Sequence, residues 1–540
     1  MKTPVAAALM VLIAAAWLRA DPQESKSTDT AEATTGTYKL ELSLTDAETG
    51  EPVSGVVRFQ YADGETITPD GLLRRGLGIN DKSSIHDWCV VPGPVTVELP
   101  RAPLTVTAFS GIDTAHATRT LEPPAGPSGS LKIPLTRFAD PRTDGWWNAN
   151  THVHLMKITR GESDQYLVDV GRADGLDLVY VSYLERAEAD VDYTTNRYSR
   201  HELQALSDSH VHFDHGEEHR HNFGGGGEGY GHVMLLAIPE LVYPVSIGPG
   251  ISKTGTDGLP LRRGIERAHD IGGTVIWCHN AWGLEDIPSW LSGKLEANNI
   301  FDGGTHGSYH SSFYRYLDVG IKVPFSTGTD WFIYDFSRVY IPASERPTSE
   351  EWLDQLAAGR SYITNGPLLE FRVNEQGIGE DIKLAEPGKV RVTGRAVGRV
   401  DFQRLELVQS GRVVATIDSS AQDDHFTAEL DTDLDISKSC WLALRTPPPS
   451  YPEDPDHEKT PLNEYGRELF SHTSATFIDI AGRRMFDKSA AEELLEEMTK
   501  NREFISEEAV FADDAERNLV LSVYDEGIAL LNGRIDGTGK

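Results

Sequence analysis

The sequence predicts a multidomain chain of mixed α/β and β structure, in which an irregular (β/α) barrel lies between two β-sandwiches and precedes a pair of C-terminal helices. Three observations support this. The 540 residues exceed one compact domain, at roughly 150 residues per domain. Short strand-like runs separated by Gly, Pro and Asp fill both flanks. Between them, apolar β-branched runs alternate with helical segments, which indicates parallel βα units.

The N-terminal 20 residues have the pattern of a secretory signal peptide. Lys2 supplies a weak positive charge, residues 5–18 form an apolar run of signal length, and Ala20 is a small residue for cleavage. Residues 21–36 are small and polar, which indicates a disordered linker. We therefore expect a secreted or periplasmic protein, without membrane insertion after signal cleavage.

Charge and cysteine content narrow the function classes. The net charge of −33 argues against binding nucleic acid or anionic membranes, because both require basic surface. A small-molecule or envelope-derived substrate remains the expected partner. Three cysteines, Cys89, Cys278 and Cys440, make no disulfide framework. Each is expected to be a small buried apolar residue, and strand alternation predicts that Cys278 points away from the neighbouring His279.

Changes in the hydrophobic pattern along the chain predict where the domains begin and end. Residues 37–137 alternate in the β manner and predict the first sandwich, and residues 371–482 predict the second. Residues 487–533 show helical periodicity, which predicts two amphipathic helices. The barrel is expected over residues 145–370, with helices near 164–174, 261–271 and 311–319.

Histidines concentrate in the predicted barrel. Thirteen of the 18 lie between His152 and His310, and histidine is the commonest metal ligand. Five of them crowd residues 210–221, which we expect to form a loop with at most two functional members. His152-Val153-His154 is the sharpest motif, because alternation on a strand places both imidazoles on one face, about 7 Å apart at Cα.

Later motifs can complete a metal site. Gly216-Glu217-Glu218 offers a carboxylate, and charge alone does not choose between the two glutamates. His232 opens an apolar strand, His279 ends the run TVIWCHN, and Asp330 ends IKVPFSTGTD. A buried aspartate at a strand end is costly unless it is paired or binds metal. In a (β/α) barrel these strand ends meet at one face.

The expected ligand set of histidines and carboxylates suits one or two divalent transition metal ions, such as Zn, Mn or Fe. The expected chemistry is hydrolysis, in which a metal-bound hydroxide attacks an ester, phosphoester or carbamate.

The motifs THVHL, GEEHRHN with GHVMLL, WCHN and GTDW occur in the order seen in the PHP superfamily of metal-dependent hydrolases, and they resemble its CehA/McbA-like family most. The run LTDAETGEPVSGVVRF near residue 44 resembles the start of carboxypeptidase-regulatory-like domains. The PHP resemblance implies a PHP-type barrel and phosphoesterase or carboxyl/carbamate-esterase chemistry. It selects Glu218 over Glu217 as the bridging carboxylate. The metal ligands it implies are His152, His154, Glu218, His279 and Asp330, with His232 and Glu218 as candidate catalytic residues.

Two departures from the PHP pattern predict a smaller metal site. Ser182-Tyr183-Leu184-Glu185 stands where the family has Asp-His, and Asp330-Trp331-Phe332 replaces D-x-H. Glu185, His219 or His221 are candidate substitutes. Two rival hypotheses remain: a degenerate, non-catalytic binding or scaffold protein of the cell envelope, and a metal-sequestering protein that uses the cluster at 210–221.

Overall fold

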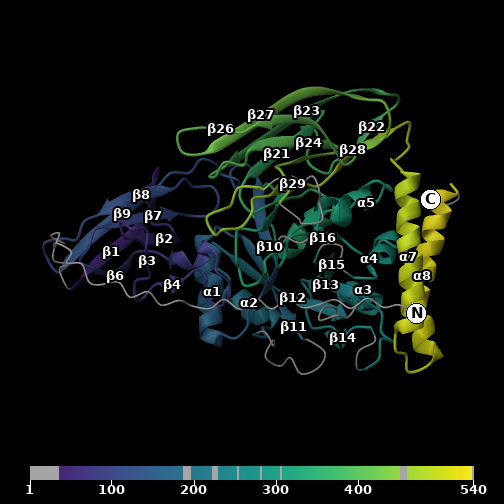
Figure 1. The fold of residues 1–540 in the computed structure, drawn as a ribbon, viewed down its shortest axis with the longest axis horizontal. Helices are drawn as coiled ribbons and strands as arrows, with labels where there is room; N and C mark the ends of the chain where they lie inside the picture. The colour runs from purple at the N-terminus through teal and green to yellow at the C-terminus, as the bar shows by residue number, and fades with distance from the viewer. Residues whose placement is uncertain are drawn as a thin grey trace, which may run out of the picture.

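A computed structural model describes residues 36–185, 196–221, 229–251, 255–279, 283–304, 307–449 and 459–537. The predicted signal peptide (residues 1–20) and the linker up to residue 35 lie outside these ranges. Among the described residues, no helix combines the length and the apolar character needed to cross a membrane. Figure 1 shows the N-terminal sheets, a central curled sheet, the C-terminal strands above it and two long helices at one side.

The N-terminal region consists of two sheets around one apolar core. Alternating burial along the first strand, in which every second residue is buried, turns one face of its sheet inward. The smaller sheet contains β6 (Val95–Pro100), β1 (Thr37–Asp46) and β9 (Ser128–Leu135). The larger one contains β4 (Leu73–Arg74), β5 (Cys89–Val91), β2 (Gly55–Gln60), β7 (Leu104–Phe109), β8 (Ala117–Leu121) and β3 (Thr66–Ile67), with the short helix η1 (Ser84–Asp87) between β4 and β5.

The central sheet is a curled, mixed half-barrel. Its strands are β10 (Trp146–His154), β11 (Leu178–Leu184), β12 (His212–His221), β13 (Gly231–Leu236), β14 (Ser246–Gly248), β15 (Thr274–Trp277), β16 (Ala297–Asn299), β17 (Phe325–Ser326), β18 (Asp330–Trp331), β19 (Arg338–Pro342) and β20 (Tyr362–Thr364). β10, β11 and β12 are parallel, as are β15, β16 and β17. The predicted mixed α/β architecture is confirmed.

Two expectations for this sheet are wrong. The segment around 210–221 is not a loop, because residues 212–221 form β12 in the middle of the sheet, with nearly every residue buried. The series is also not purely parallel, because β13 runs antiparallel to both β12 and β15. A strand this polar can be buried because its charged side chains have internal partners, which offsets the cost of removing them from water.

The helices beside this sheet begin at side-chain caps. Thr159, Ser199 and Thr348 each form a capping box with a glutamate three residues on, at the start of α1 (Arg160–Ala173), α2 (Arg200–Leu206) and α6 (Ser349–Ala357). The remaining helices are α3 (Leu261–Asp270), α4 (Asp286–Leu291), the π-helical turn η3 (His310–Tyr314) and α5 (Arg315–Leu317). The three predicted helices correspond to α1, α3 and η3–α5.

The C-terminal strands are partly an extension of the half-barrel rather than a separate sandwich. β21 (Leu368–Val373), β23 (Gly388–Gly398), β27 (Phe426–Ile436) and β26 (Ser420–Ala421) form their own sheet. The others are β22 (Ile382–Leu384), β24 (Arg404–Gln409), β25 (Arg412–Asp418), β28 (Cys440–Arg445), β29 (Ser471–Thr473) and β30 (Thr476–Ile480). They continue the central sheet, because β29 pairs with β20.

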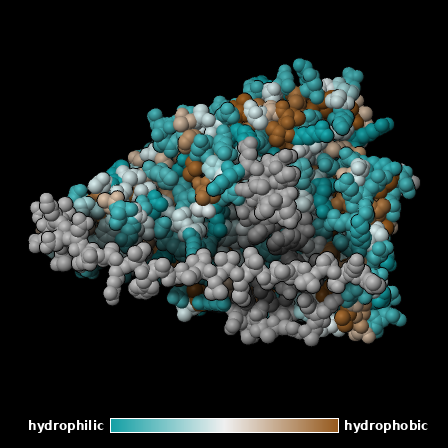
Figure 2. Space-filling view, in the orientation of Figure 1, coloured by the Kyte–Doolittle hydropathy of each residue, from teal (hydrophilic) through white to brown (hydrophobic). Residues whose placement is uncertain are grey.

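Two long helices, α7 (Lys488–Glu508) and α8 (Asp514–Ile535), confirm the predicted C-terminal pair. They lie side by side at one end of the molecule (Figure 1) and bury residues such as Leu494, Met498 and Tyr524 in the core of the half-barrel. The face shown in Figure 2 is mostly hydrophilic where residues are coloured, with small hydrophobic areas over the C-terminal strands and the helices.

A buried carboxylate at the start of α3 predicts a pH-dependent stability. Glu285 is fully buried and accepts hydrogen bonds from the backbone N–H groups of Leu261 (2.9 Å) and Arg262 (2.7 Å). Burial outweighs these donors and raises the pKa of Glu285 from 4.5 to about 7. The folded protein therefore keeps a proton that the unfolded chain releases, so stability falls as the pH rises from about 4.5 to about 7.

The expected contribution of Glu285 to this loss is at most about 3 kcal/mol. The test measures the urea midpoint of unfolding across this pH range for the protein and for its Glu285→Gln variant. The midpoint of the variant should fall less as the pH rises. Glu240→Gln is the control, because the side chain of Glu240 is 64% exposed. Parallel pH curves for the protein and Glu285→Gln would contradict the prediction.

Candidate metal centre

His152 and His154 converge at the carboxyl end of β10. Both are fully buried, their Nε2 atoms lie 2.9 Å apart, and Val153 between them is buried in the apolar core on the other side. The Nδ1 atom of His154 faces the carbonyl oxygen of Ser182 at 2.8 Å. Because a carbonyl only accepts, Nδ1 of a neutral His154 donates and Nε2 keeps its lone pair for the cluster.

Glu218 lies between two groups of side chains. Its Oε2 is 2.9 Å from His154 Nε2 and 3.7 Å from His152 Nε2. Its Oε1 is 2.8 Å from His232 Nδ1, 3.5 Å from His279 Nε2 and 3.1 Å from Arg220 Nη1. The carboxylate thus presents one oxygen to each group, which is the arrangement expected of a bridging ligand.

Asp330 completes the first group. Its Oδ1 lies 3.4 Å from His152 Nε2 and 3.6 Å from His154 Nε2. Within the described ranges this buried oxygen has no hydrogen-bond partner. The backbone of Asp330 has φ of 60°, a strained conformation that tends to occur at functional sites. Gly328 allows the approach, since a Cβ there would lie 2.5 Å from the Cβ of His152.

His279 and Cys278 belong to the second group. Cys278 is buried and unpaired, as predicted, but the prediction that it points away from His279 is wrong. Ligand atoms of Glu218, His232, Cys278 and His279 all lie within 4.8 Å of one another. Strand alternation does not apply, because β15 ends at Trp277 and His279 has φ of 64°. The turn brings both neighbouring side chains to the same centre.

Asp302 is a site residue that the sequence reasoning missed. Its Oδ2 lies 2.8 Å from His152 Nδ1 and 3.7 Å from His279 Nδ1, and the side chain is fully buried. Asp302 follows β16, near a strand end like the other residues of the centre. The pattern NNIFDGG could have revealed it, since it repeats the acid-after-strand placement of Asp330.

The charges of the centre are balanced for a cation. Burial lowers the pKa of His152, but Asp330, Asp302 and Glu218 outweigh it and raise that pKa to about 10. Burial opposes ionisation of Glu218, yet Arg220 and the surrounding histidines hold its pKa well below the usual range. Burial and Arg220 hold the pKa of His232 well below the usual range, which leaves a neutral imidazole. Ionised Glu218 and neutral His232 are already in the protonation states that metal ligands need, whereas His152 without a metal ion holds a proton that metal binding would release.

The donor set fits a divalent transition metal. Three overlapping groups have ligand atoms within 4.8 Å of one another: His152, His154, Glu218 and Asp330; Glu218, His232, Cys278 and His279; and His152, His279 and Asp302. Ligands about 2.1 Å from a tetrahedral Zn²⁺ lie about 3.4 Å apart, close to the spacings of the first group. The orphaned Asp330 oxygen gains a partner if a cation binds there.

Other predicted substitutes do not join the centre. His219 and His221 lie on the opposite face of β12 from Glu218, where His219 Nδ1 contacts Glu217 at 3.0 Å and His221 Nε2 contacts Asp257 at 3.0 Å. Among the described residues, neither they nor Glu185 falls in a metal-type group. The cluster at 210–221 does not converge on one point either, since His210 is exposed at its end.

A scan against protein-family models and a search of curated proteins return no match to this chain. Its class is therefore defined by the fold and the site: a multidomain protein with a curled mixed half-barrel that carries buried His, Glu, Asp and Cys groups able to hold metal ions. This combination is compatible with a metal-binding barrel hydrolase.

Proposed function

We propose that the protein is an exported metal-dependent hydrolase of the PHP type, acting on an ester, phosphoester or carbamate. The observation that carries the proposal is the convergence of His152, His154, Glu218 and Asp330, whose ligand atoms lie within 4.8 Å of one another at the carboxyl end of the half-barrel strands. That end of the strands is where barrels of this kind place their chemistry.

Each side chain then has a role that its contacts support. His152, His154 and Asp330 would hold one divalent ion, and Glu218 lies between them and the second group around His279. When bound, the ion supplies Lewis-acid activation of water and substrate. His232, as a neutral imidazole 2.8 Å from Glu218, is placed to hold or move a proton at its ring nitrogen.

A specific contact favours a second candidate, a non-catalytic metal-binding or scaffold protein of the cell envelope. Arg220, itself buried, contacts Glu218 Oε1 at 3.1 Å, on the side that faces the second group. A guanidinium there can replace a second cation, so that only one ion binds and turnover is lost. This alternative shares the first group of ligands with the hydrolase, but it holds a single ion and lacks turnover.

The test loads the full mature protein with Zn²⁺, Mn²⁺ or Fe²⁺, measures the metal bound, and assays p-nitrophenyl esters, phosphoesters and carbamates. We expect metal near one or two equivalents and turnover that chelation abolishes and added metal restores. His152→Ala should lose both, whereas His215→Ala, a buried histidine on β12 outside the centre, should keep both. Metal without turnover on the whole panel would favour the scaffold, and full activity of metal-free protein would refute both.

A further inference from the structure

A cleft lies at the opposite end of the half-barrel from the metal centre. It has a volume of about 690 Å³, within the size of small-molecule sites. Its walls come from loops of the N-terminal sheets and from the amino ends of β10, β11 and β12, as shown by Asn148, Leu176 and His210. His152 lies four positions after Asn148 along β10, which is about 13 Å. We call this space the junction cleft.

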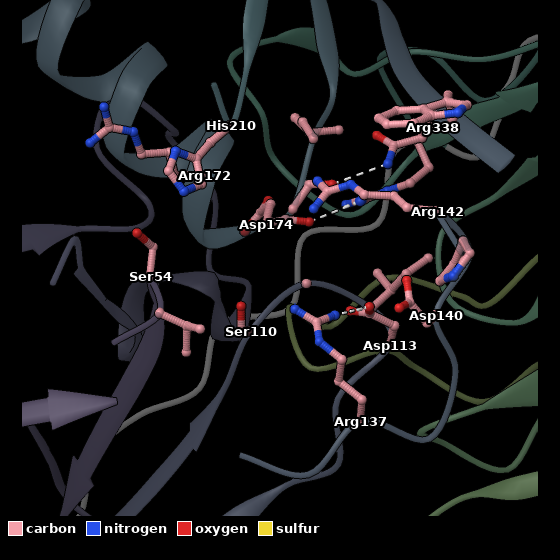
Figure 3. A pocket seen from close by; sticks show the side chains of 18 of the residues that line it. Ser54, Ser110, Asp113, Arg137, Asp140, Arg142, Arg172, Asp174, His210 and Arg338 are labelled. Atoms are coloured by element: carbon pink, nitrogen blue, oxygen red, sulfur yellow. Dashed lines mark hydrogen bonds and ion pairs between the residues drawn. The ribbon is translucent and has the colours of Figure 1, made fainter. Parts of the chain in front are cut away.

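The junction cleft gathers arginines in a protein of strongly negative net charge. Arg137, Arg142, Arg172 and Arg338 line it, together with Asp113, Asp140 and Asp174. Figure 3 shows Arg137 and Asp113 on one side and Arg142, Arg338 and Asp174 across from them. The carboxylate of Asp174 does not neutralise this surface, because it is ion-paired with the buried Arg75.

Arg338 carries a buried charge without a counter-ion. It is 1% exposed. Its Nε donates to the carbonyl of Phe336 and its Nη1 to the carbonyl of Asp174, each at 2.8 Å. Nη2 has no hydrogen-bond partner, and across the described ranges no carboxylate lies within 4.0 Å of this guanidinium. A buried charge that lacks a partner is costly. Because no carboxylate neutralises the Arg338 guanidinium, its positive charge can attract an anion in the adjoining cleft.

The other arginines are partly neutralised but reach solvent. The side chains of Arg137, Arg142 and Arg172 are 36%, 43% and 31% exposed. Arg142 contacts Asp177 through Nε, at 2.7 Å, so this ion pair uses one edge of the guanidinium. The planar fork of arginine matches carboxylate and phosphate groups.

We propose that the junction cleft binds a small anionic ligand of sugar-acid or sugar-phosphate size, held between the N-terminal sheets and the half-barrel. Its carboxylate or phosphate lies in the field of Arg338 and contacts Arg142. The half-buried Trp147 ring, whose Nε1 donates to Ala343 O at 3.2 Å, lines the same cleft and offers an apolar plane for the rest of the ligand. The site is independent of the metal centre and of the proposed hydrolysis.

Calorimetric titration of the full protein tests the proposal with three matched probes: glucuronate, glucose 1-phosphate and neutral glucose. Saturable binding of at least one anionic probe, with Kd below about 1 mM and weakening at high salt, is expected, and glucose should not bind. Which anion binds distinguishes a carboxylate from a phosphate ligand. Binding should persist in His152→Ala, which separates the junction cleft from the metal centre.

Arg142→Gln should weaken binding at least tenfold, and Arg338→Gln should abolish it. Arg391→Gln is the matched control, because Arg391 also pairs with one aspartate, Asp431, but lies on β23 away from the cleft. Arg142 is partly exposed, so its variant keeps the test valid if Arg338→Gln fails to fold. Absence of saturable binding by both anions, or equal binding by Arg142→Gln and Arg391→Gln, would overturn the proposal.

Discussion

Replacing Glu218 by Gln is expected to lower hydrolytic turnover by about a thousandfold, or about 4 kcal/mol of transition-state stabilisation, and to release most of the bound metal. The substitution keeps the shape of the side chain and removes its charge. One oxygen becomes an N–H donor, which would face either His154 Nε2 at 2.9 Å or the group around His232 and Arg220. Neither arrangement can bridge a cation as a carboxylate does.

Glu217 provides the matched control for this experiment. It is buried in the same strand, but on the other face, where it contacts His219 Nδ1 at 3.0 Å and accepts a hydrogen bond from Val242 N at 2.6 Å. Glu217→Gln should therefore retain the metal and most of the turnover. Metal analysis and steady-state kinetics of both variants test the role of Glu218. Equal losses of metal and turnover in the two variants would mean that Glu218 acts only through the stability of β12.

The second large effect is expected from Asp302→Asn, which should weaken metal affinity by about 10-fold to 100-fold. Asp302 contacts His152 through Nδ1, at 2.8 Å, while the Nε2 atom of the same ring faces His154 and Asp330. The carboxylate therefore orients the ring and keeps the proton on Nδ1. An asparagine can turn its amide N–H toward Nδ1, which favours the wrong tautomer.

Competition titrations against a chromophoric chelator measure this affinity directly, without relying on turnover. Asp335→Asn is the control, because Asp335 is another buried carboxylate in the same region but bonds Ser337 N and Asn365 rather than a histidine. Unchanged metal affinity in Asp302→Asn would contradict the positioning role, and an equal loss in Asp335→Asn would show a general effect of removing a buried charge.

Local strand alternation predicted part of the candidate centre. Alternation over Thr151 to Leu155 placed His152 and His154 on one face, and the structure brings them together with Glu218 and Asp330. The same pattern could not predict Cys278, because positive φ at His279 ends the alternation. It also misread residues 212–221 as a loop, since polar composition usually means solvent exposure and the internal partners of a strand are not visible in sequence.

The sequence by itself determined the class of architecture and the residue types of the first group, because hydrophobic periodicity and residue type are local properties. Only the tertiary structure decided which distant side chains meet: Asp302 beside His152, Arg220 on Glu218, and Arg338 at the junction cleft. These contacts span strands far apart in the chain, and their energies depend on burial and counter-charges. Such quantities exist only once the chain has folded and water has been excluded.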